Sequence, residues 1–458
     1  MDKTPIAING TNGHVEQSSV LYRQLRQPPP KVVRSKGHYL YTDDGLEIFD
    51  ASGGAAVCAI GHGHDRVKKA IAAQLDEIEY VYSLFFTTSA AERLSTLLTE
   101  STGGQMSRVF IVSSGTEAVE AALKMARQYF TELPQPQKQR TRFIARKQSY
   151  HGNTLGSLAV GSHPARRALY EPMLSANVSH VSPCYPYRES NGEDDETYVA
   201  RLAQELEDEF QRVGPDTVCA FIAETMSGAT LGCVPPVPGY LKAMKAVCER
   251  HGALFILDEV MAGMGRTGTL HAWEQEGVVP DLQTIAKGLG AGYTSIGALL
   301  VNQRVVAVLN QGTGAFMHSQ TYQGNPLACA AAYEVQRTIQ DENLLANVRE
   351  MGKYLGELLK KRLSDHPHIG DIRGRGLFWA MELVKNKETK EPFGAKEQLA
   401  WNMHLAGLEH GICMIPGNGT VDGVVGDHII VAPAYNITAQ DIDLIVERTE
   451  KALRSRLG

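Results

Sequence analysis

Short apolar runs alternate with helical patterns through the centre of the chain. Residues 218–224 (VCAFIAE) and 254–260 (LFILDEV) have the length and composition of buried strands, and residues 234–253 between them form a loop pattern followed by a helix pattern. Strands that alternate with helices in this way form βαβ units. We therefore predict an α/β fold with a mostly parallel sheet whose two faces are covered by helices.

The N-terminal part of the chain has the signals of a hairpin and of two helices. Asp44-Gly45 is a strong hairpin signal between the short runs at 38–42 and 46–50. Apolar residues at helical spacing predict helices at about 66–80 and 90–99. The aromatic stretch between them, residues 80–88, is most simply interpreted as core, although such residues also line pockets.

The composition changes near Pro326, where we expect a domain boundary. A glycine-rich loop at 312–326 is followed by a helical pattern that runs to about residue 363. The acidic run at 192–196 is best interpreted as a solvated surface loop. With 458 residues the chain is longer than one core needs, so we expect two or more subdomains.

Composition argues against several classes of protein. Hydrophobic residues make up 43% and charged residues 21% of the chain, as in ordinary soluble enzymes, and the net charge of −6 argues against a nucleic-acid partner. No apolar run approaches the roughly 20 residues that span a bilayer, so we expect no membrane partner. Because the N-terminus lacks a basic region followed by an apolar core, we expect no secretory signal. Residues 1–20 are interpreted as a polar, partly disordered leader.

Cysteine and histidine usage gives no sign of a metal site. The seven cysteines are widely spread without a Cys-x-x-Cys pair, which fits a reduced, cytoplasmic protein rather than a disulfide framework or a zinc site. The pairs His62/His64 and His366/His368 lack a third ligand nearby in sequence and are better interpreted as loop histidines. We predict no metal.

The first chemical module lies where the strand pattern at 109–112 stops and an alanine-rich helix pattern begins. Ser114, Gly115 and Thr116 stand at this junction. Free backbone N–H groups at a helix start, with small hydroxyl side chains and a glycine, can bind an anion. The alternative is a capped helix without a ligand, because the pattern is only moderately specific and does not match the P-loop.

A lone lysine, Lys287, follows a short apolar run and precedes three glycines, which leave room for something large. Asp258 ends a neighbouring strand pattern, where open α/β sheets place their ligands. Tyr150, after another short strand pattern, is either core or a stacking partner for a planar ligand. A lysine can form a Schiff base with an aldehyde, and a carboxylate can keep a pyridine nitrogen protonated. With the anion site, these features predict a pyridoxal 5′-phosphate site.

These stretches resemble a known family, the class III (omega-type) aminotransferases of pyridoxal-phosphate fold type I. LDEVMAGMGRTG at 257–268, followed by AKGLGAGY, is closely similar to the family signature, and SSGTEAVEAALK, SYHG and HSQTYQGNP match as well. The similarity runs from about Tyr39 to the C-terminus. It implies a large domain with a seven-stranded, mostly parallel sheet, a small α+β domain built from both chain ends, and a homodimer with shared active sites.

The resemblance also implies a division of the chain and a set of roles. The parts are the leader at 1–20, the N-terminal part of the small domain at 21–60, the large cofactor-binding domain at 61–326, and the C-terminal small domain with a long connecting helix at 327–458. Lys287 carries the Schiff base and Asp258 faces the pyridine nitrogen. Other cofactor-binding residues implied by the matched motifs are Ser114, Gly115, Thr116, Tyr150, His151, Gly152, Glu224, Val260 and, from the partner subunit, Thr321.

Within these roles, Tyr150 and Val260 pack on the two faces of the cofactor ring, and Glu224 helps to organise the surroundings. The implied activity is ping-pong amino transfer from an amine or omega-amino donor to a keto acid or aldehyde. Lys287, once freed from the cofactor, shuttles the proton of the donor.

The sequence departs from the family where many members hold a substrate carboxylate with an arginine. That arginine precedes a Gly-Asp-x-apolar-Pro stretch, but here Val424 and Val425 stand in its place, and no arginine occurs between Arg375 and Arg448. Ala229 replaces a glutamate that often pairs with it. We therefore expect an atypical substrate without the usual carboxylate clamp. The alternative is a relocated clamp, for which the candidates are Arg373, Arg375, His428 and Arg23.

Three rival functions remain open from the sequence. A pyridoxal-phosphate aminomutase or decarboxylase would share every cofactor residue named above. A non-catalytic binding protein on a retained fold is a second rival, although an intact Lys287 and Asp258 argue against it. A nucleotide-binding enzyme is a third, but no Gly-x-Gly-x-x-Gly follows a strand pattern.

Overall fold

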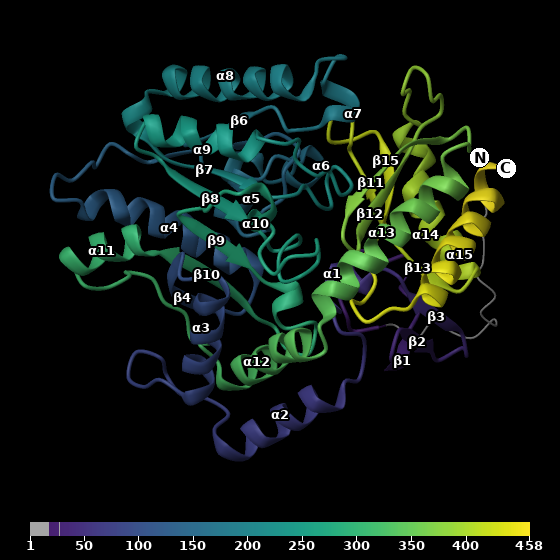
Figure 1. Ribbon diagram of the computed structural model, residues 1–458, viewed down its shortest axis with the longest axis horizontal. Helices are drawn as coiled ribbons and strands as arrows, with labels where there is room; N and C mark the ends of the chain where they lie inside the picture. Colours follow the sequence, from purple (N-terminus) through teal and green to yellow (C-terminus); the bar gives the residue numbers. More distant parts are fainter. Residues whose placement is uncertain (1–17, 27) are drawn as a thin grey trace.

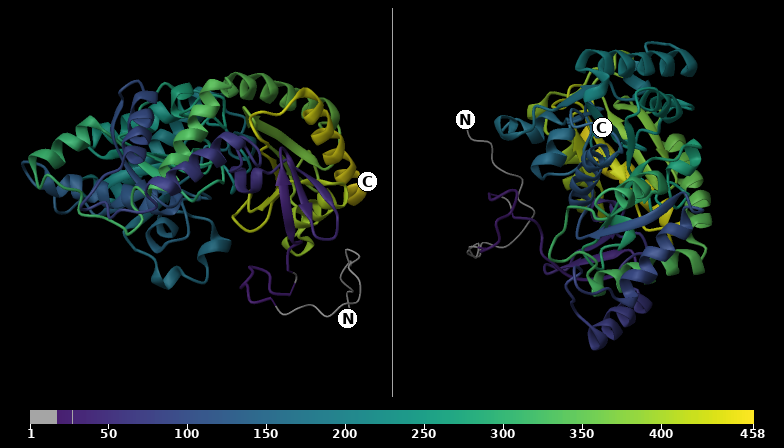
Figure 2. Two further views of the ribbon diagram at one scale, coloured as in Figure 1. Left: turned by 90° about the horizontal axis from the view of Figure 1, so that it is seen from below. Right: turned by 90° about the vertical axis from the view of Figure 1, so that its left-hand side faces the viewer.

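The computed structural model describes residues 18–26 and 28–458, so most of the predicted leader at 1–20 lies outside the described residues. The described chain contains one sheet of seven strands and two sheets of four. Figure 1 shows the large sheet and its helices on the left, and the smaller sheets with the C-terminal helices on the right. Both ends of the described chain contribute to this second part, where the N-terminal strands lie beside C-terminal elements (Figure 2).

The large sheet has the strand order β4–β10–β9–β8–β7–β5–β6. Its strands are β4 (Met106–Val112), β5 (Arg142–Arg146), β6 (Val178–Val181), β7 (Val218–Glu224), β8 (Leu254–Asp258), β9 (Leu282–Ile285) and β10 (Gly297–Asn302). β10 runs antiparallel to β4 and β9, whereas the other neighbours are parallel. The expectation of a mostly parallel seven-stranded sheet is confirmed.

Helices surround this sheet. The helices before residue 342 are α1 (Gly53–Ala56), α2 (Asp65–Glu77), α3 (Ser89–Ser101), α4 (Gly115–Glu132), α5 (Leu155–Val160), α6 (Pro164–Arg167), α7 (Pro186–Glu189), α8 (Asp195–Val213), α9 (Tyr240–Arg250), α10 (Trp273–Glu276), α11 (Gln303–Gln311) and α12 (Pro326–Asp341). Short 3-10 turns are η1 (Glu171–Met173), η2 (Pro215–Thr217), η3 (Lys287–Leu289) and, further along, η4 (Ala395–Glu397).

The central strands are apolar at nearly every position because both of their faces are covered. In β7, Ala220 and Ile222 pack with α4 and α11 on one face of the sheet. Phe221 and Ala223 pack with α8 and α9 on the other face. Successive side chains of a strand point to opposite faces, so a strand buried on both sides has a continuous apolar sequence.

The second part of the molecule joins the two ends of the chain. One sheet consists of β1 (Val32–Lys36), β2 (Tyr39–Thr42), β3 (Glu47–Asp50) and β13 (Ile412–Cys413). The other consists of β11 (Ile369–Arg375), β12 (Phe378–Leu383), β15 (Asp427–Val431) and β14 (Ile415–Asn418). The helices here are α13 (Leu344–Leu363), α14 (Leu399–Glu409) and α15 (Ala439–Leu457). Phe49, Leu355, Ile412 and Ile445 belong to one core, which unites these elements.

Most local predictions are confirmed. β2 and β3 form the predicted antiparallel hairpin around Asp44-Gly45, and α2 and α3 lie close to the predicted bounds. The long helical pattern after Pro326 is divided into α12 and α13 at Asn343, which has a left-handed φ of 52°.

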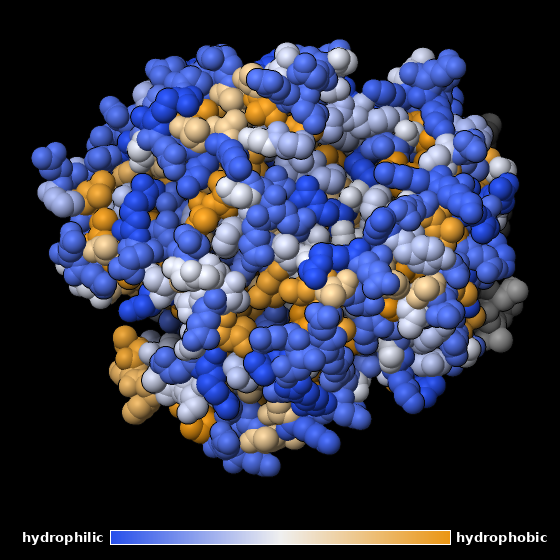
Figure 3. All heavy atoms as spheres, viewed as in Figure 1, coloured by the Kyte–Doolittle hydropathy of each residue, from blue (hydrophilic) through white to orange (hydrophobic). Residues whose placement is uncertain are grey.

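Two local interpretations are wrong at least in part. Leu84, Phe85 and Phe86 are 73%, 70% and 65% exposed, so this part of the aromatic stretch is not core. Figure 3 shows apolar side chains gathered at the lower left, over the loop between α2 and α3. The acidic run is not a loop throughout, because the Asp194 carboxylate accepts the Thr197 N–H at 2.8 Å and caps α8, which begins at Asp195.

No helix in the described ranges, 18–26 and 28–458, is both long enough and apolar enough to cross a membrane.

Candidate active site

The carboxyl ends of β7 and β8 meet at one edge of the large sheet. Glu224 and Asp258, the last residues of these strands, are direct partners in the parallel ladder. Lys287 follows β9, the next strand, and borders a cavity of about 610 Å³ together with the start of α4. Ten of the eleven predicted site residues line this cavity: Ser114, Gly115, Thr116, Tyr150, His151, Gly152, Glu224, Asp258, Val260 and Lys287.

Thr321 is the predicted residue that does not line this cavity. It lies exposed in the loop before α12, where its carbonyl oxygen accepts a hydrogen bond from the Tyr80 hydroxyl at 3.0 Å. The family resemblance assigns this threonine to the site of the other subunit, so its role stays a prediction.

The start of α4 exposes backbone N–H groups to the cavity. Ser114 is the N-cap residue, and the N–H groups of Gly115 and Thr116 lie in the first turn, where a helix offers no acceptor. Neighbouring backbone comes very close, since a Cβ on Gly297 would overlap the Ser114 carbonyl and one on Gly115 would stand 2.8 Å from Val260. Small residues therefore hold this turn in place without covering its N–H groups, which suits the turn to bind an anion.

The hydroxyl of Thr116 is already engaged by α5 and the turn before it. Its Oγ1 lies 2.6 Å from Ser157 Oγ and 2.8 Å from Thr154 Oγ1. Gly152 passes so close, with a φ of 132°, that a Cβ there would overlap the Thr116 side chain. The backbone N–H of Thr116 is therefore the group that stays free for a phosphate.

Asp258 is held by two neighbours. Its Oδ2 lies 2.7 Å from His151 Nδ1, and its Oδ1 accepts the Val260 N–H at 2.9 Å. Both side chains of the pair are buried, and His151 Nε2 has no partner among the described residues. Asp258 is thus a fixed carboxylate at the floor of a cavity, which suits it to face a ring nitrogen.

Lys287 enters the cavity from a strained backbone. Its φ of 44° lies in the left-handed region, which costs an L-residue about 1–2 kcal/mol. Burial lowers the pKa of its amine to about 8, although Asp258 and Glu224 act in the opposite direction. A substantial fraction of neutral amine is therefore available near pH 8, as a nucleophile or a base requires.

Glu224 supports the turn that carries Tyr150. Its Oε1 accepts the Tyr150 N–H at 3.3 Å, and its Oε2 accepts the Gly228 N–H at 2.9 Å. Burial raises the pKa of this carboxyl group. Glu224 thus links the end of β7 to two loops that border the cavity.

Sequence reasoning missed several residues of the cavity wall. Thr294 has a buried hydroxyl without a partner among the described residues. Val57, Met226 and Met261 give the wall an apolar part, together with Ala229. Val57, Met226, Met261 and Thr294 follow different elements, and no local pattern marks them, because only the tertiary fold brings them together.

Three of the four candidates for a relocated carboxylate clamp are engaged elsewhere. Arg373 pairs with Glu382 at 2.7 Å and with a second carboxylate, and it is only 8% exposed. Arg375 pairs with a carboxylate of α10 at 2.6 Å. His428 lies 3.1 Å from the Ala229 carbonyl oxygen, and burial lowers its pKa to about 3, so its ring is neutral.

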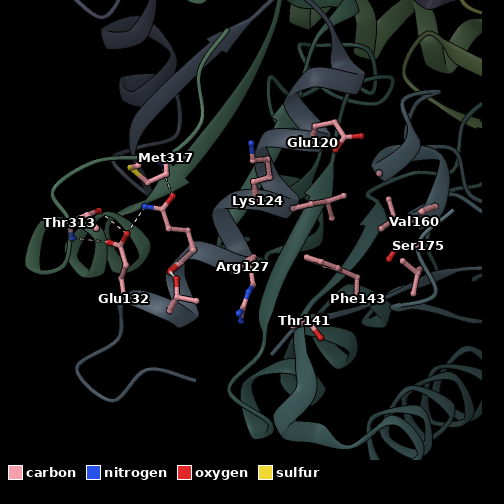
Figure 4. Close-up of a pocket in the computed structure, with 16 residues that line it drawn as sticks. Glu120, Lys124, Arg127, Glu132, Thr141, Phe143, Val160, Ser175, Thr313 and Met317 are labelled. Atoms are coloured by element: carbon pink, nitrogen blue, oxygen red, sulfur yellow. Dashed lines mark hydrogen bonds between the residues drawn. The ribbon is translucent and has the colours of Figure 1, made fainter. Parts of the chain in front are cut away.

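A second cavity, of about 700 Å³, lies on the outer side of α4 (Figure 4). Lys124 and Arg127 extend from α4 between Met317 on one side and Phe143 on the other. Lys124 Nζ lies 2.9 Å from His318 Nδ1. None of the eleven predicted site residues lines this cavity, so it is separate from the cavity around Lys287.

Comparison with known proteins gives a consistent result. The family model described as "Aminotransferase class-III" matches residues 22–453. A protein named "Aminotransferase" from Gibberella zeae is 51% identical over 441 residues, which cover 96% of this chain and 86% of that protein. The crystal structure of an (S)-enantioselective omega-transaminase from Thermomicrobium roseum has a TM-score of 0.90 at 33% identity, with 97% of each chain covered. An amine transaminase from an uncultivated Pseudomonas species, in the PLP-bound form, has a TM-score of 0.89 at 32% identity, covering 98% of this chain and 99% of that chain.

The cavity fits pyridoxal phosphate on its own structural features. The free N–H groups at the start of α4 suit a phosphate. His151 Nε2 and the Thr294 hydroxyl, which have no partner within residues 18–26 and 28–458, offer buried polar groups, and the Lys287 amine, with its lowered pKa, is able to react with an aldehyde.

Proposed function

Because the chain belongs to the class III aminotransferase family, we propose that it takes its amino group from an amine that carries no carboxylate. The protein is a pyridoxal-phosphate-dependent aminotransferase, with an amine donor and a keto acid acceptor. The observation that carries the proposal is the cavity wall. Among the described residues that line the cavity there is no arginine, and Val57, Met226, Ala229 and Met261 make part of the wall apolar.

The cofactor, when bound, supplies an aldehyde that condenses with amines and a pyridine ring that withdraws electrons from the reacting bonds. In the proposed assignment, Asp258 holds a proton at the ring nitrogen. His151 fixes the orientation of that carboxylate, since its Nδ1 lies 2.7 Å from Oδ2. Tyr150 and Val260 would pack on the two faces of the ring, and the start of α4, with Ser114, Gly115 and Thr116, would bind the phosphate.

Lys287 performs the proton transfer in this proposal. Its neutral amine would take the proton from the α-carbon of the donor and would later give a proton back, so that Lys287 acts as a proton shuttle. The pKa of about 8 keeps enough of the amine neutral to accept a proton and lets it release that proton again. The same steps in reverse pass the amino group to a keto acid or an aldehyde, which gives ping-pong kinetics.

A donor-by-acceptor activity matrix tests the substrate class. We expect alkyl or arylalkyl amines that carry no carboxylate to give a higher kcat/KM than ornithine or 4-aminobutyrate, whichever acceptor is present. Lys287→Ala provides the background rate. A strong preference for ornithine or 4-aminobutyrate with 2-oxoglutarate would overturn the proposal.

The stoichiometry of the same reactions separates amino transfer from the rival chemistry of this fold. An aminomutase would isomerise one substrate without consuming a keto acid, and a decarboxylase would release carbon dioxide. We expect one amino group to appear on the acceptor for each donor consumed.

We propose a homodimer in which Thr321 of each chain completes the phosphate site of the other. Thr321 is exposed, and so are the apolar side chains of Leu84, Phe85 and Phe86. Exposed apolar groups of this kind favour a covered interface. Sedimentation should give twice the chain mass of 50.0 kDa, and a monomer mass at micromolar concentration would contradict the proposal.

We further propose a cytoplasmic location and the division into parts at residues 21–60, 61–326 and 327–458. The location is supported by seven free cysteines, most of them buried. The division is supported by the large sheet, whose strands lie between Met106 and Asn302, and by the pairing of β3 with β13 across the two chain ends. Limited proteolysis near Pro326 and fractionation of cells would test these two points.

A further inference from the structure

A keto acid acceptor brings a carboxylate into a cavity whose wall has no arginine. Of the cations nearby, Arg373 and Arg375 are paired with carboxylates, and His428 is neutral. Arg266 is fully buried and donates to the carbonyl oxygens of Leu377 and Pro433. None of these groups is free for a substrate.

Arg166, on α6, differs from these residues. Its guanidinium carbon lies 4.6 Å from the centre of the Tyr150 ring, and Tyr150 lines the cavity. Within residues 18–26 and 28–458, its side chain has no ion pair or hydrogen bond, although it is half-buried. A half-buried cation without an anionic partner has lost part of its hydration and has gained no interaction in return. An incoming carboxylate would supply that interaction.

A second arginine strengthens the case. Burial lowers the pKa of Arg166, and the charge of Arg23, on the exposed N-terminal segment, acts in the same direction, whereas Tyr150 acts against it. No carboxylate among the described residues pairs with either group, so an anion bound there would relieve the repulsion. Burial is the main cause of the lowered pKa of Lys287, and the charge of Arg166 acts in the same direction.

The position of α6 is fixed by the C-terminal part of the chain. His163 Nε2 lies 3.1 Å from the Asn418 carbonyl oxygen, and Pro164 packs so tightly on Gly423 that a Cβ there would overlap it. The side chain of the next residue, Arg167, already has partners, because it donates to the carbonyl oxygen of Ala159 at 2.8 Å and pairs with Glu171. Of the two adjacent arginines, only Arg166 is left available.

We propose that Arg166 binds the carboxylate of the 2-oxo acid acceptor. This inference rests on the proposed function, and it adds the residue that binds the acceptor substrate. The planar guanidinium can hold a carboxylate by two parallel hydrogen bonds while its face stays on the Tyr150 ring. The apolar part of the wall then receives the side chain of the donor amine. By microscopic reversibility, Arg166 also binds the carboxylate of the amino acid product, which is alanine when pyruvate is the acceptor.

Equilibrium binding of an unreactive pair of ligands to the holoenzyme tests this directly. Propanoate carries the carboxylate and propanamide is its neutral counterpart of similar shape, so calorimetry with both isolates the charge. We expect Arg166→Met to raise the dissociation constant of propanoate roughly 10- to 100-fold and to leave that of propanamide unchanged. Arg166→Lys should fall between, since an ammonium group cannot form the fork.

Kinetics and a matched control complete the test. In Arg166→Met the KM for pyruvate should rise much more than kcat falls, whereas the KM for propanal stays constant. Arg212→Met removes the same charge from the exposed end of α8 and should change neither of these two KM values.

Wild-type protein that binds no propanoate, or an unchanged propanoate affinity in Arg166→Met, overturns the proposal. An equal loss with propanal and propanamide also overturns it, because Arg166 would then act only by positioning Tyr150. Failure of the proposed function is distinct, since it would appear as absent turnover of wild-type protein while propanoate binding still reports on Arg166.

Discussion

The amine of Lys287 and the carboxyl groups of Asp258 and Glu224 border one cavity, yet they are held in different ways. Asp258 is fixed by His151 and by a backbone N–H, whereas burial raises the pKa of Glu224 and lowers that of Lys287. Lys287 and Asp258 could be predicted from the sequence, because each follows a recognisable strand pattern at the ligand edge of a sheet. Arg166 could not, since its distinguishing feature is that no acidic group in the described part of the chain pairs with it.

At this scale we predict the reactivity of Lys287 in the cofactor-free protein. An amine-reactive acylating reagent should modify Lys287 with a rate that rises through pH about 8, because only the neutral amine reacts. Lys353, whose side chain is 78% exposed, serves as the comparison within the same digest. Peptide mass spectrometry measures both sites. An onset for Lys287 as late as that for Lys353 would contradict the lowered pKa.

The same shift has a defined sign for stability. Between pH about 8 and the ordinary lysine value, the unfolded chain binds more protons at this residue than the folded chain does. The contribution of Lys287 to the free energy of unfolding of the cofactor-free protein therefore rises with pH across this window and is least favourable below it.

At the scale of elements, strands buried on both faces were the easiest to predict, as the continuous apolar runs of β7 and β8 show. α8 was missed, although Tyr198, Leu202, Leu206 and Phe210 recur every four residues and are all buried. The many charged residues between these four positions made the helical apolar pattern hard to recognise. The aromatic loop after α2 was predicted to be core for another reason. Apolar composition indicates that side chains will be buried, but it does not indicate whether the same chain or another chain buries them.

The close contact between β10 and the start of α4 leads to a prediction about cofactor affinity. Gly297→Ala places a Cβ against the Ser114 carbonyl and must displace the first turn of α4. We expect the dissociation constant for pyridoxal phosphate to rise at least about 10-fold, because shifted N–H groups bind the phosphate less well. Equilibrium dialysis measures the affinity, and circular dichroism checks the fold.

Gly394→Ala is the matched control for this substitution. Its φ is −69°, and a Cβ there would meet its nearest neighbour at 3.4 Å, so the backbone and the space both admit alanine. Equal cofactor affinity in the two variants would show that the geometry of this turn does not govern phosphate binding.

At the scale of the whole molecule, a buried ionic network joins the two parts of the chain. Glu382 of β12 is fully buried and receives Arg373 of β11 and Arg188 of α7, with the Tyr185 hydroxyl as a further donor. Arg373 also donates to the Gly232 carbonyl oxygen at 2.7 Å. Burial opposes ionisation of Glu382, but the two guanidinium groups outweigh it and hold its pKa below the ordinary value.

We therefore predict a structural role for Arg373, which the sequence had suggested as a substrate clamp. Arg373→Met should lower the free energy of unfolding by about 3–5 kcal/mol, because it removes a partner from a buried carboxylate. The KM for pyruvate should stay constant in the variant that remains folded. Urea denaturation with activity assays measures both quantities. Lys451→Met, which breaks an exposed pair with Glu447, should change stability by less than about 0.5 kcal/mol.

The pH dependence of this network has the opposite sign to that of Lys287. Since the pKa of Glu382 is lowered in the fold, its contribution is fully present above the ordinary glutamate value of about 4.3 and is lost as the pH falls through the folded value. An acid titration of Arg373→Met should accordingly be flatter than that of the wild-type protein. If the stability of the two proteins fell in parallel with decreasing pH, the loss of stability in acid would be due to other groups.

The pairing of β3 with β13 has a consequence for synthesis. β3 cannot pair with β13 until Cys413 has been synthesised, about 360 residues after its partner Asp50. The sheet whose strands leave the ribosome first is therefore among the last to be completed. At roughly 5–20 residues per second, that interval lasts on the order of 20–70 s. During this time the open edge of β3 and the apolar residues beside it have no native cover from their own chain, and a nascent chain of this protein is therefore a natural client for a chaperone that shields extended segments.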